Sequence, residues 1–291
     1  MAYGLRVDAF CGNCESSIET MSAGKLEGKV NLVTGANSRI GRAIAEKCLL
    51  EGAKVAVHGL NQSEVDSAVG ELGSNAFRIR RDLADTESPV EIVEATVAKF
   101  GKLDGVVNNA AVIIRGRFED TDAAKFDQSM AVNVRAPFLI CQAAIPHLKL
   151  SKGCVLNIGS INARGGEAIL SAYSVSKGVL QTMSRNLAGI YSKRKIRFTH
   201  LNLGWVLLET EYLGKLDDGL PEGWPEKLDK GVVPRSKMTQ PSELANVVAF
   251  WLSDDSRPFS GPFSTWSSIL FSGRTPPSTK TLKWENDCEQ R

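Results

Sequence analysis

Three polar residues in the middle of the chain, Ser160, Tyr173 and Lys177, have the types and spacing for proton transfer. Tyr173 and Lys177 are four residues apart in the stretch YSVSK, so on a helix their side chains share one face. An ammonium beside a phenol favours the phenolate, so we expect the pKa of Tyr173 to fall towards neutrality from about 10. Tyr173 is then a usable general acid or base near pH 7, and Ser160 can hydrogen-bond the same substrate oxygen. The alternative is a chance surface pair, which is common for any single YxxxK match.

A second stretch, TGANSRIG at residues 34–41, has the residue types of a phosphate-binding turn. Gly35 permits a tight turn, Gly41 permits close contact between helix and strand, and the amides that begin a helix point at a phosphate. Arg39 stands where a third glycine is expected, so the backbone has less freedom to approach a pyrophosphate. Its guanidinium can offset this by pairing with a phosphate. Alone, the stretch is equally compatible with an ordinary turn between a strand and a helix.

Two further turns carry polar residues. Asp82, in RDL, is either an acceptor for the amino group of an adenine or an ordinary turn aspartate. Asn108 and Asn109, in NNAA, need hydrogen-bond partners if they are buried at the end of a strand. They can clamp neighbouring strands, support a backbone cradle for a cofactor ribose, or do both.

Strand and helix patterns alternate from Lys29 onward, and each of these turns follows a predicted strand. The alternation predicts an α/β fold, a Rossmann-like doubly wound parallel sheet of about seven strands with helices on both faces. We expect Ser63 to cap the second helix and Pro137 to bend the fourth. Predicted strands cover residues 29–36, 54–59, 75–83, 103–111, 153–160, 195–204 and 261–269, and predicted helices cover 39–53, 63–73, 88–101, 122–148, 171–191 and 240–254.

Length and composition narrow the class of protein. The chain has 291 residues, with 43% hydrophobic and 23% charged residues, which is ordinary for a soluble globular protein. A net charge of +2 gives no electrostatic case for a nucleic-acid partner. No apolar run approaches the ~20 residues of a membrane helix, and no secretory signal is evident. The six cysteines lack a disulfide framework, so we expect reduced thiols, a cytoplasmic location and no membrane partner.

We divide the chain into a flexible leader at 1–24, a single dinucleotide-binding catalytic domain at 25–273 and a polar tail at 274–291. The leader contains CGNC, Cys11 to Cys14, which faintly resembles the metal loop of heavy-metal-associated domains. One CxxC without a second pair cannot complete a four-coordinate zinc site. We therefore expect no metal, with metal or redox use of this pair as the alternative.

Residues 205–238 form a long segment that we predict to be irregular and to act as a substrate lid. Its aromatic residues are Trp205, Tyr212 and Trp224, and it also carries several acidic residues. Such a lid suits a polyol or sugar-like substrate. The same residues also fit a few packing aromatics under solvated charge, and we prefer this second interpretation.

The ordered series TGANSRIG, RDL, NNAA, NVRAPF, NIGS, YSVSK and LNLGWV resembles the short-chain dehydrogenase/reductase family over about residues 25–273. The resemblance implies that Ser160 orients the substrate, that Tyr173 is the catalytic acid/base, and that Lys177 binds the nicotinamide ribose and tunes the tyrosine. It also implies that Asn133, in AVNV, holds a water in a proton relay. The implied cofactor-binding residues are Gly35, Asn37, Ser38, Arg39, Ile40, Gly41, Asp82, Leu83, Asn109, Ala110, Tyr173, Lys177, Gly204 and Val206.

The implied activity is hydride transfer between a nicotinamide cofactor and a small-molecule alcohol or carbonyl substrate. The chain departs from the family pattern at Arg39, Leu203 and Leu208, positions that touch cofactor binding, and more mildly at Ala111. The alternative function is therefore a catalytically silent family member that serves as a binding or scaffold protein.

The second predicted strand ends in VHGLNQ, so neither the acid that favours NAD nor the arginine that favours NADP stands at Gly59 and Leu60. We expect NADP(H) to be preferred over NAD(H), because Arg39 can supply the missing cation and His58 or Asn61 can add polar contacts. The resemblance also implies a homodimer or homotetramer, formed through the helices that hold Tyr173 and Asn133.

Overall fold

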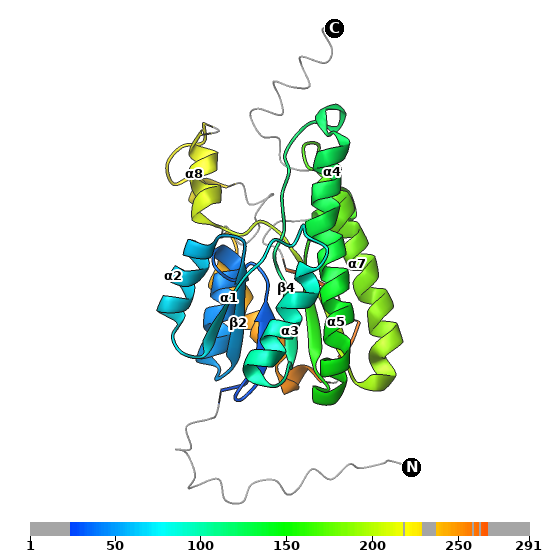
Figure 1. Ribbon diagram of the computed structural model, residues 1–291. Coiled ribbons are helices and arrows are strands. Elements are labelled where there is room, and N and C mark those ends of the chain that lie inside the picture. Colours follow the sequence, from blue (N-terminus) through cyan, green and yellow to red (C-terminus); the bar gives the residue numbers. More distant parts are fainter. Residues whose placement is uncertain (1–23, 218, 229–236, 258, 262, 267–291) are drawn as a thin grey trace, which may run out of the picture.

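The computed structural model describes residues 24–217, 219–228, 237–257, 259–261 and 263–266 (Figure 1). All but the last residue of the predicted leader, the cysteine pair in it and the whole polar tail lie outside these residues. Within the described part of the chain, no helix has the length and apolar character needed to cross a membrane.

The strands form one sheet with the order β3-β2-β1-β4-β5-β6-β7, in which every pairing is parallel. The strand order reverses between β1 and β4, so the predicted doubly wound, Rossmann-like fold is confirmed. The strands are β1 Val30–Val33, β2 Lys54–Gly59, β3 Ala76–Arg80, β4 Gly105–Asn108, β5 Cys154–Ser160, β6 Arg197–Leu203 and β7 Phe263–Trp266.

Helices cover both faces of the sheet, with α1 and α2 on one side and α3, α5 and α7 on the other in Figure 1. Neighbouring strand residues face opposite layers: Val33 packs in the core with α1 and α9, and Leu32 in the core with α3 and α5. The helices are α1 Arg39–Leu50, α2 Gln62–Leu72, α3 Ser88–Phe100, α4 Ala123–Met130, α5 Ala136–Ser151, α6 Asn162–Gly165, α7 Ser171–Tyr191, α8 Glu209–Asp217 and α9 Pro241–Leu252. Single turns of 3₁₀-helix are η1 Phe118–Asp120, η3 Ser192–Arg194, η4 Trp224–Lys227 and η5 Asp254–Ser256.

The predicted long helix at 122–148 is interrupted where the sequence places its proline. A π-helical turn, η2 Ala131–Arg135, separates α4 from α5, and Pro137 lies in the first turn of α5. Proline has no backbone N–H and cannot continue a regular helix on its amino-terminal side, so the widened turn is the form that the expected bend takes.

Two local predictions are wrong. The second helix is capped by Asn61 rather than Ser63, because the Asn61 side chain accepts hydrogen bonds from the amides of Ser63 and Glu64. The segment at 205–238 is not irregular throughout, since it contains α8 and η4. Glu209 and Glu211 favour the start of α8, where acidic side chains complement the helix dipole.

One buried polar side chain of β1 has no hydrogen bonds among the described residues. Asn31, in β1, is fully buried, and neither its Nδ2 nor its Oδ1 has a partner among the described residues. Gly105 of the adjacent β4 leaves room for it, because a Cβ there would lie 2.2 Å from Asn31 Oδ1. Asn31 is therefore a stability cost within an otherwise apolar strand.

Candidate active site

The residues singled out for proton transfer come together at the carboxyl edge of the sheet. Ser160 ends β5, and Tyr173 and Lys177 lie in the first half of α7. The Ser160 hydroxyl hydrogen-bonds the Tyr173 side chain, and Lys177 Nζ lies 5.6 Å from the centre of the Tyr173 ring. Lys177 Nζ also donates a hydrogen bond of 2.8 Å to the Ile158 carbonyl, which fixes the ammonium beside β5. The three side chains therefore form one buried group.

Burial dominates the titration of this group. The pKa of Tyr173 is raised from its usual value because burial disfavours the phenolate, and the Ser160 hydrogen bond offsets only part of that effect. The expected lowering is therefore wrong for Tyr173 in this structure. Burial also lowers the pKa of Lys177 to about 8. Both shifts favour the neutral form of each residue.

Asn133 lies in the π-helical turn and binds two other segments. Its amide donates to the Val112 carbonyl at 2.9 Å and accepts from the Val112 amide at 2.8 Å. Asn133 Nδ2 also donates at 3.0 Å to Ser176 Oγ, whose hydroxyl bonds the Tyr173 carbonyl at 2.7 Å. Asn133 thus joins the loop after β4 to the helix of Tyr173. The role of Ser176 was not predicted, although it stands within YSVSK.

The predicted phosphate turn follows β1 at the same edge. Gly35 has φ +63°, a conformation that favours glycine, and a Cβ on Gly41 would lie 2.0 Å from the Gly35 carbonyl oxygen. Both glycines are therefore required by geometry. Arg39 has φ +53°, so an arginine adopts the left-handed conformation where the family pattern has glycine. Ser38 provides no side-chain cap to α1, which leaves the first helix amides open to an anion.

Asn109 fastens this turn to β4. Its Nδ2 donates to the Thr34 carbonyl at 2.8 Å and to the Gly35 carbonyl at 3.3 Å. The Thr34 hydroxyl accepts from the amides of Asn109 and Ala110, at 2.9 Å and 3.0 Å. The predicted clamp between neighbouring strands is present, and Thr34 is a member that sequence reasoning missed.

His58, near the end of β2, supports the same turn from the other side. Its Nδ1 accepts from the Gly35 amide at 3.3 Å, and its Nε2 lies 3.1 Å from the Arg81 carbonyl. Burial lowers the pKa of His58 to about 4, so the ring is neutral, with Nδ1 accepting and Nε2 donating. The imidazole therefore serves to position the turn.

The remaining predicted cofactor residues surround this edge. Ile40 and Gly41 lie in α1, Leu83 is buried after β3, and Gly204 and Val206 follow β6, where Val206 forms a bridge with Thr239.

Asp82 Oδ1 accepts from the Ala84 amide at 2.8 Å, which is the bond of a turn aspartate. Asn37 Nδ2 donates to Glu64 at 2.7 Å, beside Gly59 at the end of β2.

The aromatic residues of the predicted lid pack on one another. Trp224 is buried, and its ring lies 5.3 Å from Trp205 and 6.2 Å from Tyr212 between ring centres. The indole of Trp205 donates to Glu211 at 2.8 Å. Leu208, which replaces a family threonine, packs against the apolar core. These contacts favour the packing interpretation of the aromatics.

A chain of buried polar side chains runs behind the site, between the sheet and α7. Asn108 donates to Asn157 at 2.7 Å, and Asn157 donates to the hydroxyl of Ser184 at 2.8 Å. The chain continues from Ser184 to His200 Nδ1 (3.1 Å), from His200 Nε2 to Asn202 (2.9 Å) and from Asn202 to Gln181 (2.7 Å). Burial lowers the pKa of His200 to about 4, so this ring is also neutral.

A parallel sheet of this strand order with a glycine turn after its first strand defines a protein of the Rossmann class. A family model described as enoyl-(acyl carrier protein) reductase matches residues 35–263. A 2-(S)-hydroxypropyl-CoM dehydrogenase 3 of Xanthobacter autotrophicus is 33% identical over 79% of this chain and 91% of its own. A trihydroxynaphthalene reductase of Colletotrichum orbiculare is 32% identical over 81% of this chain and 86% of its own. The chain belongs to the short-chain dehydrogenase/reductase family of oxidoreductases.

Solved structures of reductases share the fold of this chain. The L-sorbose reductase of Gluconobacter frateurii, complexed with NADPH and L-sorbose, matches with a TM-score of 0.80 and 25% identity over 87% of this chain and 99% of that chain. The 3-ketoacyl-(acyl-carrier-protein) reductase of Brucella melitensis, complexed with NADH, matches with a TM-score of 0.73 and 28% identity over 82% of this chain and 97% of that chain.

Proposed function

We propose that the protein is an NAD(P)-dependent oxidoreductase that transfers a hydride between the nicotinamide and an alcohol or carbonyl carbon, with Tyr173 as the general acid/base. The observation that carries the proposal is the buried group of Ser160, Tyr173 and Lys177 at the same sheet edge as the glycine turn. The bound nicotinamide supplies or accepts the hydride. Ser160 and Tyr173 bind the substrate oxygen, and Tyr173 gives it a proton or takes one.

The titration of Tyr173 bears on the direction of proton transfer. A tyrosine with a raised pKa holds its proton at neutral pH, so it is suited to donating that proton to a carbonyl oxygen during reduction. In this proposal the Lys177 ammonium, which lies beside the ring, stabilises the negative charge that develops on Tyr173 as its proton leaves. In this proposal Lys177 also binds the nicotinamide ribose, and Asn133 positions a relay water.

The residues of the turn fit a dinucleotide. Close approach of α1 to β1 at Gly41 and the uncapped start of α1 suit a pyrophosphate. Relatives in complex with NADPH and with NADH support a nicotinamide cofactor of either type. In this proposal the residues around the turn hold the adenosine half, and Asn109, Ala110, Gly204 and Val206 lie against the nicotinamide half.

We propose NADP(H) over NAD(H). Arg39 is exposed and forms no ion pair within the described residues, so its guanidinium is available to the extra phosphate of NADP. Glu64, held by Asn37 beside Gly59, opposes this preference by its charge. Replacing Arg39 with glutamine should weaken NADPH binding about tenfold and change NADH binding little. Arg42→Gln is the matched control, because Arg42 is already paired with Glu46 and Glu71.

A small-molecule substrate, a homodimer or homotetramer and a cytoplasmic location complete the proposal. Cys48, Cys141 and Cys154 are buried free thiols, which suits a reducing compartment. A silent binding protein is the second candidate, favoured by the strained arginine in the phosphate turn.

A titration of the purified protein with NADPH and NADH, followed by tryptophan quenching and cofactor emission, separates the two candidates. Saturable binding of either cofactor supports the enzyme and makes a substrate screen the next step. Absence of binding at high concentrations of both would reject the enzyme and leave the scaffold.

A further inference from the structure

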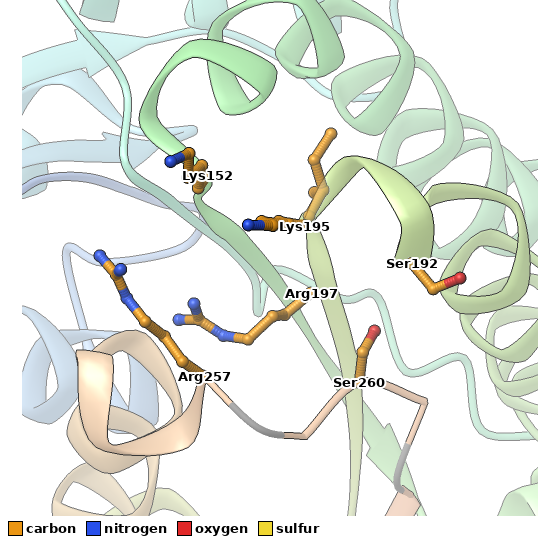
Figure 2. Close-up of a pocket in the computed structure, with 7 residues that line it drawn as sticks. Lys152, Ser192, Lys195, Arg197, Arg257 and Ser260 are labelled. Carbon is orange, nitrogen blue, oxygen red and sulfur yellow. The ribbon is translucent and has the colours of Figure 1, made fainter.

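A second cluster of cationic side chains lies at the amino edge of the sheet, away from the candidate active site. Arg197 begins β6, Lys152 follows α5, Lys195 follows η3 and Arg257 follows η5. With Ser192 and Ser260, they line a cavity of about 460 Å³, here called the basic cavity. Figure 2 shows the four cationic side chains gathered around this space, with the ends of Lys195 and Arg197 pointing to the same side. The candidate catalytic residues lie at the other end of the same strands.

Arg197 is the buried member of the cluster. Its side chain belongs to a residue that is only 5% exposed, and its Nη2 donates to the carbonyls of Ser253 at 3.1 Å and Trp251 at 3.5 Å. Its Nε is buried and has no hydrogen-bond partner by distance and angle among the described residues. Burial raises the pKa of the Cys154 thiol, and the guanidinium lies close enough to this thiol to lower that pKa in part. The carbonyls at the end of α9 compensate part of the charge, but one N–H of the guanidinium fork remains unsatisfied. A buried donor of this kind is costly unless an acceptor reaches it.

The charge around Arg197 is poorly balanced. Arg257 is paired with Asp254 at 2.8 Å, and Asp254 also holds Lys29 at 2.7 Å. Lys152 and Lys195 have no ion-pair partner within the part of the chain that the structure describes. Three cations, Lys152, Lys195 and Arg197, therefore line one cavity without an ion pair of their own among the described residues, and the Asp254 carboxylate is shared between Arg257 and Lys29.

We propose that the basic cavity binds the phosphate group of a small soluble ligand. A phosphate dianion offers enough charge and acceptor oxygens to bind both lysines at once, and the Arg197 charge beside them adds to the attraction. Ser260 adds a hydroxyl donor, because its oxygen already accepts from the Phe198 amide at 3.3 Å and its proton is uncommitted among the described bonds. The site is separate from the dinucleotide turn, so it stands independently of the proposed enzyme activity.

The first test is calorimetric titration with inorganic phosphate at constant ionic strength. Wild-type protein should bind phosphate, and Lys152→Gln/Lys195→Gln should weaken that binding about tenfold or more. Lys149→Gln/Lys193→Gln removes the same charge from exposed neighbours that do not line the cavity, so it should bind as the wild type does. Equal effects of the two double variants, or no effect of either, would overturn the proposal. Lys152 and Lys195 have positive φ angles of 52° and 59°. Glycine and asparagine adopt such angles more easily than lysine, so they would change the backbone strain as well as the charge. Glutamine changes the charge alone.

The second test locates the anion, since phosphate can also bind at the turn of residues 34–41. Crystals soaked in tungstate, a tetrahedral dianion with anomalous scattering, should show tungsten beside Arg197, and tungsten at the turn alone would overturn the proposal. Arg197→Lys keeps the charge but replaces the planar guanidinium by a compact ammonium, and should weaken phosphate binding without loss of the folded circular dichroism spectrum. Unchanged affinity in this variant would count against the role of the guanidinium.

A comparison of two ligands identifies the source of the phosphate group. Tighter binding of glycerol 3-phosphate than of inorganic phosphate indicates that the natural ligand is a phosphate ester, and equal binding indicates free phosphate.

Discussion

Tyr173 is the residue to which we assign the proton transfer, and the Tyr173→Phe variant tests this role directly. Removing the hydroxyl in Tyr173→Phe leaves the ring packed and leaves Ser160 and Lys177 in place. We expect turnover to fall about 10²- to 10⁴-fold, while the Kd of the cofactor changes little. Steady-state rates and a fluorescence titration measure the two effects separately. Tyr191→Phe, at the far end of the same helix, is the matched control and should keep full activity; unchanged turnover in Tyr173→Phe would contradict the mechanism.

Lys177 gives a pH-dependent prediction. Its folded-state pKa of about 8 lies below the ordinary value, so between about pH 8 and pH 10 the unfolded chain holds more protons than the folded one. Stability attributable to Lys177 therefore rises with pH across this window. Lys177→Met should be more stable than the wild type below pH 8, and this advantage should shrink by about 3 kcal/mol towards pH 10.5.

Urea unfolding of both proteins from pH 7 to pH 10.5 measures this difference. Lys193→Met, at an exposed lysine, should show no such trend. A constant difference between Lys177→Met and the wild type across the whole range would show that Lys177 keeps an ordinary pKa.

At the scale of elements, β1 carries an avoidable cost at Asn31. Asn31→Val removes two buried polar atoms that lack partners and adds a β-branched residue suited to a central strand. We expect unfolding free energy to increase by about 1–3 kcal/mol. Calorimetry should record a rise in Tm of about 2–4 °C per kcal/mol. Asn61→Val, which removes the cap of α2, should instead lower the Tm, and a lower Tm in Asn31→Val would reveal a hidden partner of Asn31.

The elements that periodicity predicted well are those whose packing repeats along the chain. The helix expected at 171–191 is observed as Ser171–Tyr191, because its buried residues recur at helical spacing. The misplaced cap of α2 and the missed α8 depend on local side-chain bonds, which a hydrophobic pattern does not record.

The predictions about the candidate site were also right where they rested on a pattern and wrong or missing where they depended on packing. Motif order predicted which residues meet at the sheet edge, since the ends of parallel strands converge. The titration of Tyr173 was mispredicted because depth of burial is a property of the whole packed domain. The supports supplied by Thr34, His58 and Ser176 are contacts between distant segments, so no local pattern marks them.

At the scale of the whole molecule, α5 and α7 both present apolar side chains to solvent. Phe138, Val175 and Val179 are 51%, 50% and 40% exposed. We predict that Phe138→Glu/Val179→Glu converts the proposed homodimer or homotetramer to smaller species, because charge is costly in an apolar interface. Light scattering after size exclusion gives the mass. Leu50→Glu, at an 82% exposed residue of α1, should leave the mass unchanged, and a monomeric wild type would refute the prediction.

The polar chain from Asn108 to Gln181 has a direction. Asn108, Asn157 and Asn202 each donate through Nδ2 towards Gln181, and His200 Nε2 donates in the same sense to Asn202 Oδ1 in the tautomer whose Nδ1 accepts from Ser184. The Ser184 hydroxyl also lies 2.8 Å from the Leu180 carbonyl, with which His200 Nδ1 competes for its one proton. Aligned in this way, the group dipoles add, and the low dielectric of the interior strengthens the sum. The negative end of this row of dipoles is Asn108 Oδ1, which has no hydrogen-bond partner among the described residues. The field of these dipoles therefore makes the end of β4, beside the dinucleotide turn, a place where positive charge is stabilised.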